Sequence, residues 1–502
     1  LSLHLAASKF EFMWGRFLIT IGILSVVFNG YSQQKQWIDL LNQPNVNYFE
    51  MVKAYQQQYA NQEIKPHNGH KQFERWLWNN SGRVLSDGSL QSNVEIENAA
   101  QFYYRQHASR SLTGNWVEIG PWQEENYSRG VGRLTCMAFD PSDPYKFYVG
   151  TPAGGLFYTE DDGKTWVKPD DNIANFGVSS IAVDPKNANV VYAGTGDADA
   201  RETDGRGVWK STDGGKTWVE KNLGMGNITV GKLIIDPHNS QVIYAATETG
   251  IWKSKDRGGA WVLKYPNKDM RDLEMKPNDS KVLYASNYVS GLGALIFISK
   301  DEGETWEQKF VFDGLYPDLR YELAVCKKNP DLLIGVGGLR IVKTLDMGDT
   351  FTVVTTEGNQ LYDRDNRQGW YNAAFEIDPT NENKWFVGNV QLYKTTDAGE
   401  TFLSTRHTHA DNHFLAFSPH NNDLYVCDDG GIHRSKDGGH TFEDLTNFGN
   451  SAIYSVSQSP FNSEHTLTGY QDCGSKYYDG YKWTSTYGAD GMQPLFDATD
   501  SN

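Results

Sequence analysis

Seven copies of one eight-residue pattern constrain this chain more than any other feature of its sequence. The pattern, Ser/Thr-x-Asp-x-Gly-x-Thr-aromatic, is clearest at Ser211–Trp218, which reads Ser-Thr-Asp-Gly-Gly-Lys-Thr-Trp. One copy departs from it, with Ala260 at the Thr position. The aspartates recur every 40 to 52 residues and are Asp161, Asp213, Asp256, Asp301, Asp346, Asp397 and Asp437. A repeat of this length is typical of the four-stranded blades of a β-propeller.

The pattern predicts a turn between two antiparallel strands. An Asp carboxylate followed by x-Gly can accept backbone N–H bonds across a turn, because Gly adopts the positive φ that other residues avoid. The Ser or Thr hydroxyl adds a local hydrogen bond, and the final Trp or Phe buries its ring at the start of the next strand. We therefore interpret the seven aspartates as structural residues of the scaffold.

The pattern resembles the Asp-box (BNR) repeat of bacterial sialidases, xyloglucanases and the ectodomain of sortilin. Secreted bacterial proteins of the sortilin type are the most similar, on three further stretches: Gly150–Gly155, His409–His413 and Asp428–Gly431. The resemblance implies a β-propeller whose boxes lie on the outer rim, far from the central channel. It also implies either two tandem rings, as in xyloglucanases, or one very large ring, as in sortilin.

Runs of alternating β-branched and aromatic residues between the boxes predict short strands. The second unit shows them most clearly, at 178–185, 190–194, 207–210 and 217–221. After the seventh box, an eighth unit without the pattern covers 454–487, and 491–502 is expected to begin a ninth inner strand. The predicted fold over residues 113–502 is therefore all-β: a multi-bladed β-propeller of seven Asp-box blades and a degenerate eighth, truncated at its C-terminal end.

Residues 1–32 are predicted to contain residues upstream of the true start and a secretory signal peptide. From Met13 the chain passes through a basic start, an apolar run at 17–28 and a small polar segment, which is the order found in such peptides. The apolar run is too short to cross a bilayer, and we expect cleavage near Ser32. The mature chain has no predicted transmembrane segment and is expected to be secreted or to lie at the cell surface.

Residues 33–112 are predicted to form a helical N-terminal segment. Apolar and aromatic residues recur at helical spacing over 47–59, after an Asn start, and again over 71–78. Two roles are open for this segment: it packs against the propeller, or it is a removable pro-segment.

Charge and cysteine spacing limit the partners of the chain. The net charge of −17, without a Lys/Arg-rich run, argues against a nucleic-acid partner, because phosphate binding needs a clustered basic surface. The cysteines follow no metal or redox spacing, and we expect buried thiols at Cys136, Cys326, Cys427 and Cys473. No cofactor is expected.

A glycoside hydrolase needs two carboxylates across the scissile bond. The resemblance to xyloglucanases would place the first in an Arg-Thr-Asp-Ile-Gly-Gly stretch of the first blade. The matching string here is Gly-Thr-Pro-Ala-Gly-Gly at Gly150–Gly155, with Pro152 at the position of the acid. The Phe/Tyr-Arg-Ile-Pro signature of sialidases is absent, and the arginines follow no triad pattern: Arg133, Arg271, Arg320 and Arg340. These departures count against catalysis.

The candidate ligand-binding residues are those expected near the mouth of the channel: His407, His409, Asp411, His413, Asp428, Asp429, Trp370 and Tyr371. The first four alternate along the chain, so an extended backbone would project them to one side. Imidazole and carboxylate together suit a transition metal, but hydrogen-bonded residues that shape the channel mouth fit the same pattern, and the metal is unknown. The two aromatic residues are interpreted as sugar platforms or as channel lining. An acidic loop at 195–207 lacks the Gly that an EF-hand requires and is expected to be a solvated insertion.

The sequence therefore predicts an exported β-propeller that binds a glycan or an extracellular protein through loops at the channel mouth, without catalysis. The alternatives are a glycoside hydrolase of the xyloglucanase or sialidase type, and a component of cell-surface adhesion or assembly. Polysaccharide or extracellular protein are the expected partners.

Overall fold

The structure is a computed structural model. In it the chain forms two compact units, residues 1–113 and 114–502. It describes residues 46–60, 70–92, a few positions at 37–40 and 95–103, and 117–499 except for short gaps. The gaps are 123–129, 170–175, 268, 289–293, 312–319, 338–339, 355–368 and 406–407. The predicted signal peptide lies outside the described residues. None of the helices that the structure describes is long and apolar enough to cross a membrane.

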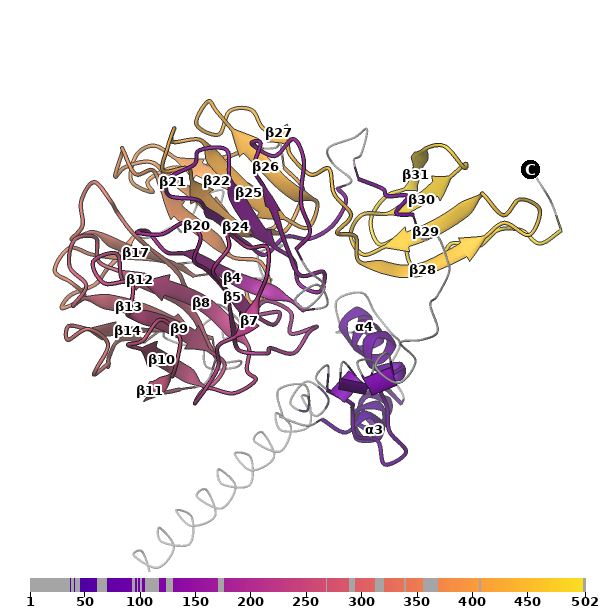
Figure 1. The fold of residues 1–502 in the computed structure, drawn as a ribbon, viewed down its shortest axis with the longest axis horizontal. Coiled ribbons are helices and arrows are strands. Elements are labelled where there is room, and N and C mark those ends of the chain that lie inside the picture. The colour runs from indigo at the N-terminus through magenta and orange to yellow at the C-terminus, as the bar shows by residue number, and fades with distance from the viewer. Residues whose placement is uncertain are drawn as a thin grey trace, which may run out of the picture. The chain divides into compact units, whose positions relative to one another are not determined.

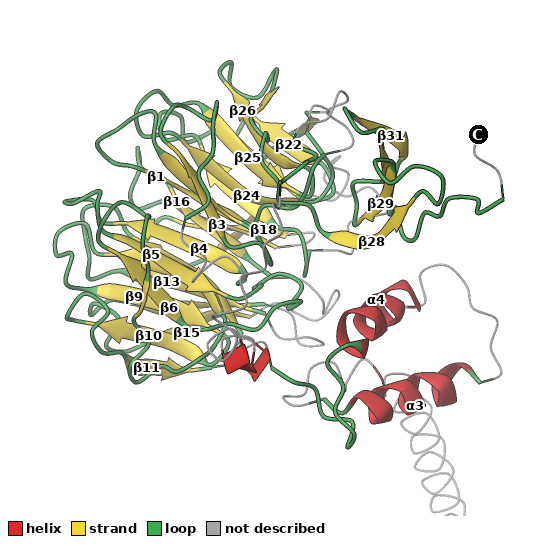
Figure 2. Cartoon of the chain, turned by 45° about the vertical axis from the view of Figure 1, so that its right-hand side comes forward, coloured by secondary structure: helices red, strands yellow, loops and turns green. Residues whose placement is uncertain are grey.

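The first unit includes the helices α3 (Tyr48–Tyr59) and α4 (His70–Ser81), shown in red in Figure 2. The α3 helix begins after Asn47, whose side chain accepts hydrogen bonds from the backbone N–H groups of Phe49 and Glu50. A small aromatic core holds the two helices together, because their apolar faces bury Trp37, Met51, Ala54, Tyr55 and Phe73.

The second unit consists of eight antiparallel sheets, each formed by consecutive strands (Figure 1). The first four sheets are β1 (Cys136–Phe139), β2 (Phe147–Gly150), β3 (Leu156–Thr159); β4 (Val178–Val183), β5 (Val191–Thr195), β6 (Val208–Ser211), β7 (Val219–Glu220); β8 (Val230–Ile235), β9 (Ile243–Thr247), β10 (Gly250–Ser254), β11 (Val262–Pro266); and β12 (Met270–Met275), β13 (Leu283–Asn287), β14 (Leu295–Ser299), β15 (Glu307–Val311). The other four are β16 (Glu322–Val325), β17 (Leu333–Gly337), β18 (Arg340–Thr344), β19 (Thr352–Val354); β20 (Ala374–Ile377), β21 (Trp385–Gly388), β22 (Leu392–Thr395), β23 (Leu403–Ser404); β24 (Asn412–Phe417), β25 (Leu424–Asp428), β26 (Gly431–Ser435), β27 (Glu443–Asp444); and β28 (Ile453–Gln458), β29 (Thr466–Tyr470), β30 (Ser475–Tyr478), β31 (Trp483–Tyr487). This architecture confirms the predicted all-β, multi-bladed propeller.

The strands of a sheet differ in burial according to their place in it. The second strands are buried on both faces, as in β5 and β9, because sheets pack against both sides of them. Their sequences are accordingly continuous apolar runs such as Ile-Tyr-Ala-Ala in β9. The fourth strands are exposed, and several are only two residues long, as in β7, β23 and β27. Edges this short offer little backbone for pairing with another chain.

The first strands of seven sheets contact one another in a closed cycle. The order is β1, β4, β8, β12, β16, β20 and β24, and β24 contacts β1 again. The eighth sheet, β28 to β31, lies beside this ring and is yellow in Figure 1. The expected ninth strand is not formed, since residues 491–499 contain no strand and no described segment pairs with them as a ladder.

The junction between β1 and β24, which we call the seam, joins two sheets that are far apart in the sequence. The N–H of Leu134 donates to the carbonyl of Asp428 (3.1 Å), and that of Val131 donates to Gly430 (2.9 Å). The N–H donors come from residues just before β1, and the carbonyls lie in the turn after β25. No strand is exchanged across the seam, because both sheets consist of consecutive strands.

Side chains around and within the eighth sheet also bind the segment that precedes β1. Ser451 Oγ donates to the carbonyl of Val131 (2.6 Å), and Asn450 Nδ2 donates to that of Gly132 (2.8 Å). The fully buried Lys476 donates its ammonium to the carbonyl of Gly130 (2.8 Å). The eighth sheet is thus tied to one side of the seam.

The turns of the ring lie on two opposite faces. Because each sheet is an antiparallel meander, the turns after its first and third strands meet at one end, which we call the box face. The N–H of Gly214 in one box donates to the carbonyl of Asn189 in the neighbouring first turn (2.9 Å), and Arg257 donates to Gln241 in the same way (3.0 Å). The turns after the second strands and the connections between sheets lie at the other end, which we call the site face.

Each Asp box is closed by hydrogen bonds of its own residues. In the second box, Ser211 Oγ donates to Asp213 (2.7 Å), and Thr217 donates to the same carboxylate through its N–H (2.9 Å) and its hydroxyl (2.6 Å). Burial opposes ionisation of Asp213, but these hydrogen bonds outweigh it and lower its pKa to about 2. The box at Asp256 lacks the hydroxyl bond because Ala260 replaces Thr. The carboxylates are therefore fully engaged within their turns.

Candidate functional site

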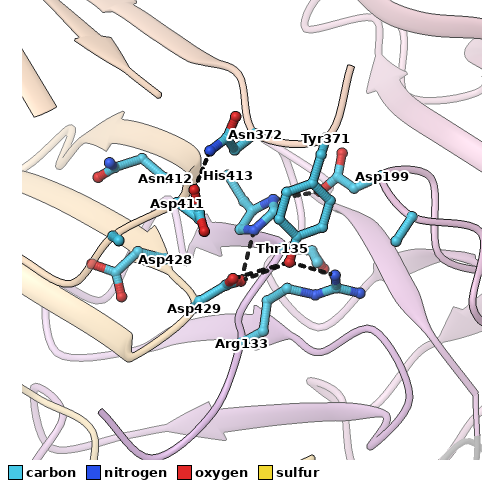
Figure 3. A network of polar contacts seen from close by, with 12 residues as sticks. Arg133, Thr135, Asp199, Tyr371, Asn372, Asp411, Asn412, His413, Asp428 and Asp429 are labelled. Carbon is cyan, nitrogen blue, oxygen red and sulfur yellow. Dashed lines mark hydrogen bonds and ion pairs between the residues drawn. The ribbon is translucent and has the colours of Figure 1, made fainter. Parts of the chain in front are cut away.

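Six connections and turns of the site face, one of which continues into the start of β24, bring together a network of charged and aromatic side chains (Figure 3). They come from the segment before β1, the turn after β5, the connections before β16, β20 and β24, and the turn after β25. The members are Arg133, Asp197, Asp199, Arg320, Tyr371, Asn372, Asp411, His413 and Asp429.

His413 occupies the centre of this network. Its Nδ1 lies 2.8 Å from Asp199 and its Nε2 lies 2.9 Å from Asp429, and the side chain is fully buried. Burial alone would lower the pKa of His413, but the hydrogen bonds to these two carboxylates raise it to about 9. His413 is therefore a cation at neutral pH, and both of its ring nitrogens donate hydrogen bonds.

Two arginines complete the pairing of the buried carboxylates. Arg133 donates to Asp197 (2.7 Å) and to the hydroxyl of Tyr371 (2.9 Å). Arg320 donates to Asp199 (2.5 Å) and also lies 2.8 Å from Glu322. Each buried charge thus faces at least one opposite charge, which is the condition under which buried ions are tolerated.

Asp429 receives hydrogen bonds from two sides. The Tyr371 hydroxyl lies 3.0 Å from its Oδ2 and His413 lies 2.9 Å from its Oδ1. Burial opposes ionisation, yet the imidazolium of His413 lowers the pKa of Asp429 below its ordinary value. Asp429 is therefore a buried, ionised carboxylate that is held by its neighbours.

Asp411 has the opposite electrostatic situation. Its carboxyl is half-buried, and Asn372 donates a hydrogen bond to it. Burial and the neighbouring charge of Asp429 raise the pKa of Asp411 to about 6. The site face therefore carries two adjacent carboxyl groups, Asp411 and Asp429, whose pKa values are shifted in opposite directions.

Asp428 forms a separate buried pair with His433, at 3.1 Å. Its Oδ1 also accepts the N–H groups of Gly430 (2.9 Å) and Gly431 (3.0 Å). Burial lowers the pKa of His433, but the Asp428 carboxylate raises it overall. Asp428 therefore shapes the turn that carries Asp429.

The predicted alternation of histidines and Asp411 on one side of an extended backbone is wrong. Asp411 has a φ of +65°, so the chain bends there and separates the side chains on either side of it. His409 is nearly buried, with Nδ1 3.1 Å from the carbonyl of Ala410, whereas His413 points into the charged network. His407 lies outside the described residues. Within the described part of the chain, no group of three or more His, Cys, Asp or Glu side chains is arranged to hold a metal ion.

The two predicted aromatic residues have different environments. Tyr371 is 9% exposed, its ring packs edge-on against His413 at 4.8 Å, and its hydroxyl belongs to the network. Trp370 is partly exposed beside it, with ring centroids 5.7 Å apart. Of the two, Trp370 is the one with ring surface available to a ligand.

The expectation of a solvated acidic insertion at 195–207 is wrong for two of its carboxylates. Asp197 is fully buried and Asp199 is 9% exposed. They are buried because Arg133, Arg320 and His413, from distant parts of the chain, neutralise them. The sequence signal for this burial was a single arginine shortly before each of two strands, Arg133 before β1 and Arg320 before β16. The carboxylates that these arginines pair with lie in another sheet, so the pairing could not be inferred from the sequence.

A small cavity adjoins the network at the mouth of the channel. It has a volume of about 70 Å³ and is lined by polar side chains that include Lys232, Asp272, Arg320 and Glu322. Lys232 lies 3.1 Å from Asp272, so the charges in the cavity are paired. The cavity is much smaller than the 300 Å³ or more that ligand pockets usually provide. This cavity is therefore too small to enclose a sugar ring.

Comparison with protein families and curated proteins gives two findings. The family model described as Sortilin-Vps10, "Sortilin, neurotensin receptor 3", matches residues 206–312. A xyloglucanase of Hypocrea jecorina is 31% identical over 137 residues, which are 24% of this chain and 16% of that protein. The xyloglucanase Xgh74A of Acetivibrio thermocellus is 27% identical over 139 residues, 25% of this chain and 16% of the relative. The matches thus span about one sixth of the length of these relatives.

Two solved structures share the fold over most of this chain. The GH74 xyloglucanase from Xanthomonas campestris aligns with a TM-score of 0.55 and 15% identity, covering 74% of this chain and 71% of the other. The GH74 enzyme from Niastella koreensis aligns with a TM-score of 0.52 and 18% identity, covering 74% and 69%. At these identities the similarity is one of fold.

These findings correct the expectation that the chain has no catalytic activity. The curated relatives are named as xyloglucanases, which favours the glycoside hydrolase that the sequence analysis gave as an alternative. The earlier expectation relied on Pro152 in one loop of the first blade. That inference was too narrow, because a carboxylate pair can come from loops of several blades, and this site face brings Asp199 of the second sheet together with Asp411 and Asp429 of the seventh.

Proposed function

We propose that this protein is a glycoside hydrolase that cleaves a β-glucan-type polysaccharide, such as xyloglucan, on the site face of the propeller. The names of its curated relatives support the reaction and the substrate class. The partly exposed Trp370 beside the network supports a polymer lying across this face, because aromatic rings present a flat apolar surface for sugar rings.

The observation that carries the proposal is the pair formed by Asp411 and Asp429. A glycoside hydrolase needs one carboxyl that keeps its proton in weakly acidic solution, where an ordinary Asp is ionised, in order to protonate the leaving oxygen. Asp411, with its pKa raised to about 6 by burial and by Asp429, meets this requirement. It is also half-buried, so its carboxyl retains access to the surface.

Asp429 itself is 1% exposed and engaged by Tyr371 and His413, so it acts on Asp411 through its charge. The second reacting carboxylate must be more accessible. We assign this role to Asp472, a half-buried residue on the loop after β29. Its neighbour Cys473 donates its thiol to the backbone carbonyl of Asp429 (3.3 Å), so the loop that carries Asp472 lies against the network.

In this arrangement the substrate lies between the seven-sheet ring and the eighth sheet. Asp411 donates its proton to the glycosidic oxygen as the bond to the sugar carbon breaks. Asp472 stabilises the positive charge that develops on the sugar ring, either by direct attack or through a water molecule that it deprotonates. His413 stays protonated between Asp199 and Asp429 and keeps the Asp429 charge in place.

The ring arrangement and the location of the protein follow as parts of the same proposal. The closed cycle of seven first strands supports a complete seven-bladed ring, and the eighth sheet beside it supports tandem rings over one very large ring. The signal-peptide pattern in residues 1–32 supports export, which a polymer substrate also requires because it does not cross membranes.

The test is hydrolysis of xyloglucan and other β-glucans, measured as released reducing ends. We expect turnover by the wild type and a loss of about a hundredfold or more in kcat for Asp411→Asn and for Asp472→Asn. Asp213→Asn, on the box face, is the matched control and should keep its kcat. Absence of cleavage on every glucan, or full activity in Asp411→Asn, would refute the proposal.

A further inference from the structure

Asn372 is the neighbour of Asp411 that the catalytic proposal leaves unused. It is fully buried, and its Nδ2 donates a hydrogen bond to Oδ1 of Asp411. Within the part of the chain that the structure describes, no other side chain donates a hydrogen bond to this carboxyl. Asn372 precedes β20, whereas Asp411 precedes β24, so the contact joins two neighbouring sheets.

The other polar atom of the Asn372 side chain is in an unusual situation. Its Oδ1 is buried and has no hydrogen-bond partner among the described residues. A buried carbonyl oxygen without a partner is unfavourable by the full cost of its lost hydration. Rotation of the amide by half a turn would bring this oxygen to Asp411, where it can accept a hydrogen bond once Asp411 is protonated.

The charged neighbours of Asp411 cannot perform this function. Asp429 disfavours the ionised form of Asp411, and His413 and His409 favour it, so each acts on one protonation state. An amide carries a donor and an acceptor in one plane and can therefore bind either state in the same place.

We propose that Asn372 is a positioning residue that holds the Asp411 carboxyl in one orientation both before and after proton transfer. The inference rests on the proposed function, in which Asp411 gives up its proton during each turnover. When Asp411 is ionised, the Asn372 N–H group donates to it. When Asp411 is protonated, its O–H donates to the carbonyl of Asn372. The Asp411 carboxyl thus stays oriented toward the glycosidic oxygen throughout the catalytic cycle.

The first experiment measures the proton affinity of Asp411 without using activity. The protein is labelled with ¹³C at the Asp carboxyl carbons, and the signal of Asp411 is identified by its loss in Asp411→Asn. In Asn372→Ala the titration of Asp411 should move upward by about half to one pH unit, because the ionised form loses a charge-assisted hydrogen bond and the protonated form loses only a weaker, neutral one.

Asn412→Ala is the matched control. Asn412 is also fully buried and is next to Asp411 in the sequence, but its amide donates to the carbonyl of Asn389 (2.7 Å). This variant should leave the titration of Asp411 unchanged. Asn372→Ser, which restores a small donor and acceptor, should recover part of the shift and serves if Asn372→Ala does not fold.

The second experiment uses hydrolysis of xyloglucan as a function of pH. Asn372→Ala should lower kcat by up to about a hundredfold with KM nearly unchanged, and should move the basic limb of the profile upward by the same amount as the titration. In the Asp411→Asn background, Asn372→Ala should have no further effect.

The inference is overturned if Asn372→Ala leaves the titration of Asp411 in place, or if Asn412→Ala moves it equally. Failure of the proposed function has a different signature. A protein that cleaves no glucan but shows the expected shift would retain the Asn372–Asp411 contact and lose only its catalytic meaning.

Discussion

The aspartates of the box face and those of the site face are one residue type in two contrasting settings. On the box face, the partners of each carboxylate lie two residues before it and three or four residues after it, within one turn. On the site face, Asp199 and Asp429 share the imidazolium of His413, which comes from another sheet than Asp199, and Asp429 also accepts a hydrogen bond from Tyr371 of a neighbouring sheet. A carboxylate that is satisfied within its own turn supports the scaffold wherever the turn recurs. A carboxylate that depends on distant parts of the chain depends on the whole ring.

The two faces also differ in how their pKa values vary. The pKa is lowered in all seven box aspartates, and hydrogen bonds from the same turn are the cause of the lowering in each. On the site face, the pKa of Asp429 is lowered and that of Asp411 is raised. Proton-transfer chemistry requires neighbouring carboxyl groups with different pKa values, whereas a repeated structural turn gives all of its carboxyl groups similar pKa values.

The largest test of this contrast is the removal of His413. His413→Leu leaves Asp199 and Asp429 buried without their shared cation, so the free energy of unfolding should fall by about 3 to 5 kcal/mol. Urea denaturation at neutral pH measures it. His409→Leu is the control, because His409 is also nearly buried but bonds a backbone carbonyl, and it should lose less. If both variants lost the same free energy of unfolding, His413 would contribute no more to stability than an ordinary buried side chain does.

A smaller effect is expected from pH. The folded-state pKa of His413, about 9, lies above the 6.5 of an unfolded histidine, so its contribution to stability is complete below pH 6.5. That contribution should be lost as pH rises through 9, and it amounts to at most about 3 kcal/mol. Unfolding curves at pH 6 and pH 9 test this prediction, with His413→Leu showing a smaller difference between the two. A wild type whose stability is unchanged over this range would contradict the assigned charge of His413.

The smallest effects belong to the boxes. Asp213→Ala should lower the free energy of unfolding by about 1 to 3 kcal/mol, because amide and hydroxyl donors of the turn lose their acceptor. Asp256→Ala should cost less, since Ala260 has already removed the hydroxyl donor in that box. Thermal or urea unfolding of the two variants gives the comparison, and both should keep the activity of the wild type. Selective loss of activity in a folded Asp213→Ala protein would place function on the box face.

The boxes could be predicted from the sequence because the hydrogen bonds of each carboxylate lie within eight residues. The strands followed in the same way from alternating and continuous apolar runs, as β9 illustrates. The site was accessible only in part. Asp411, His413, Asp429 and Tyr371 were selected because they lie in three short stretches of sequence, at 370–371, 407–413 and 428–429, that precede or follow strands.

The remainder of the site depends on contacts between distant residues. The hydrogen bond of His413 to Asp199 spans 214 residues, and that of Arg133 to Tyr371 spans 238. Such pairs form only when the ring closes, so an acidic loop that appeared solvated in the sequence is buried in the fold. The φ of +65° at Asp411 is a similar case, since a local pattern of alternation gave no sign of the bend.

The seam differs from the other junctions of the ring because the two sheets that it joins are far apart in the sequence. It joins the first and the last sheets of the ring through backbone hydrogen bonds at Val131 and Leu134, and Arg133 and Asp429 lie on its two sides. If the ring opened at this junction, Arg133 and Asp429 would move apart and the site would be disrupted. A polymer bound across the site would therefore stabilise the closed junction. The hydrogen bond from Lys476 to the carbonyl of Gly130 connects the eighth sheet to the same junction and stabilises it as well.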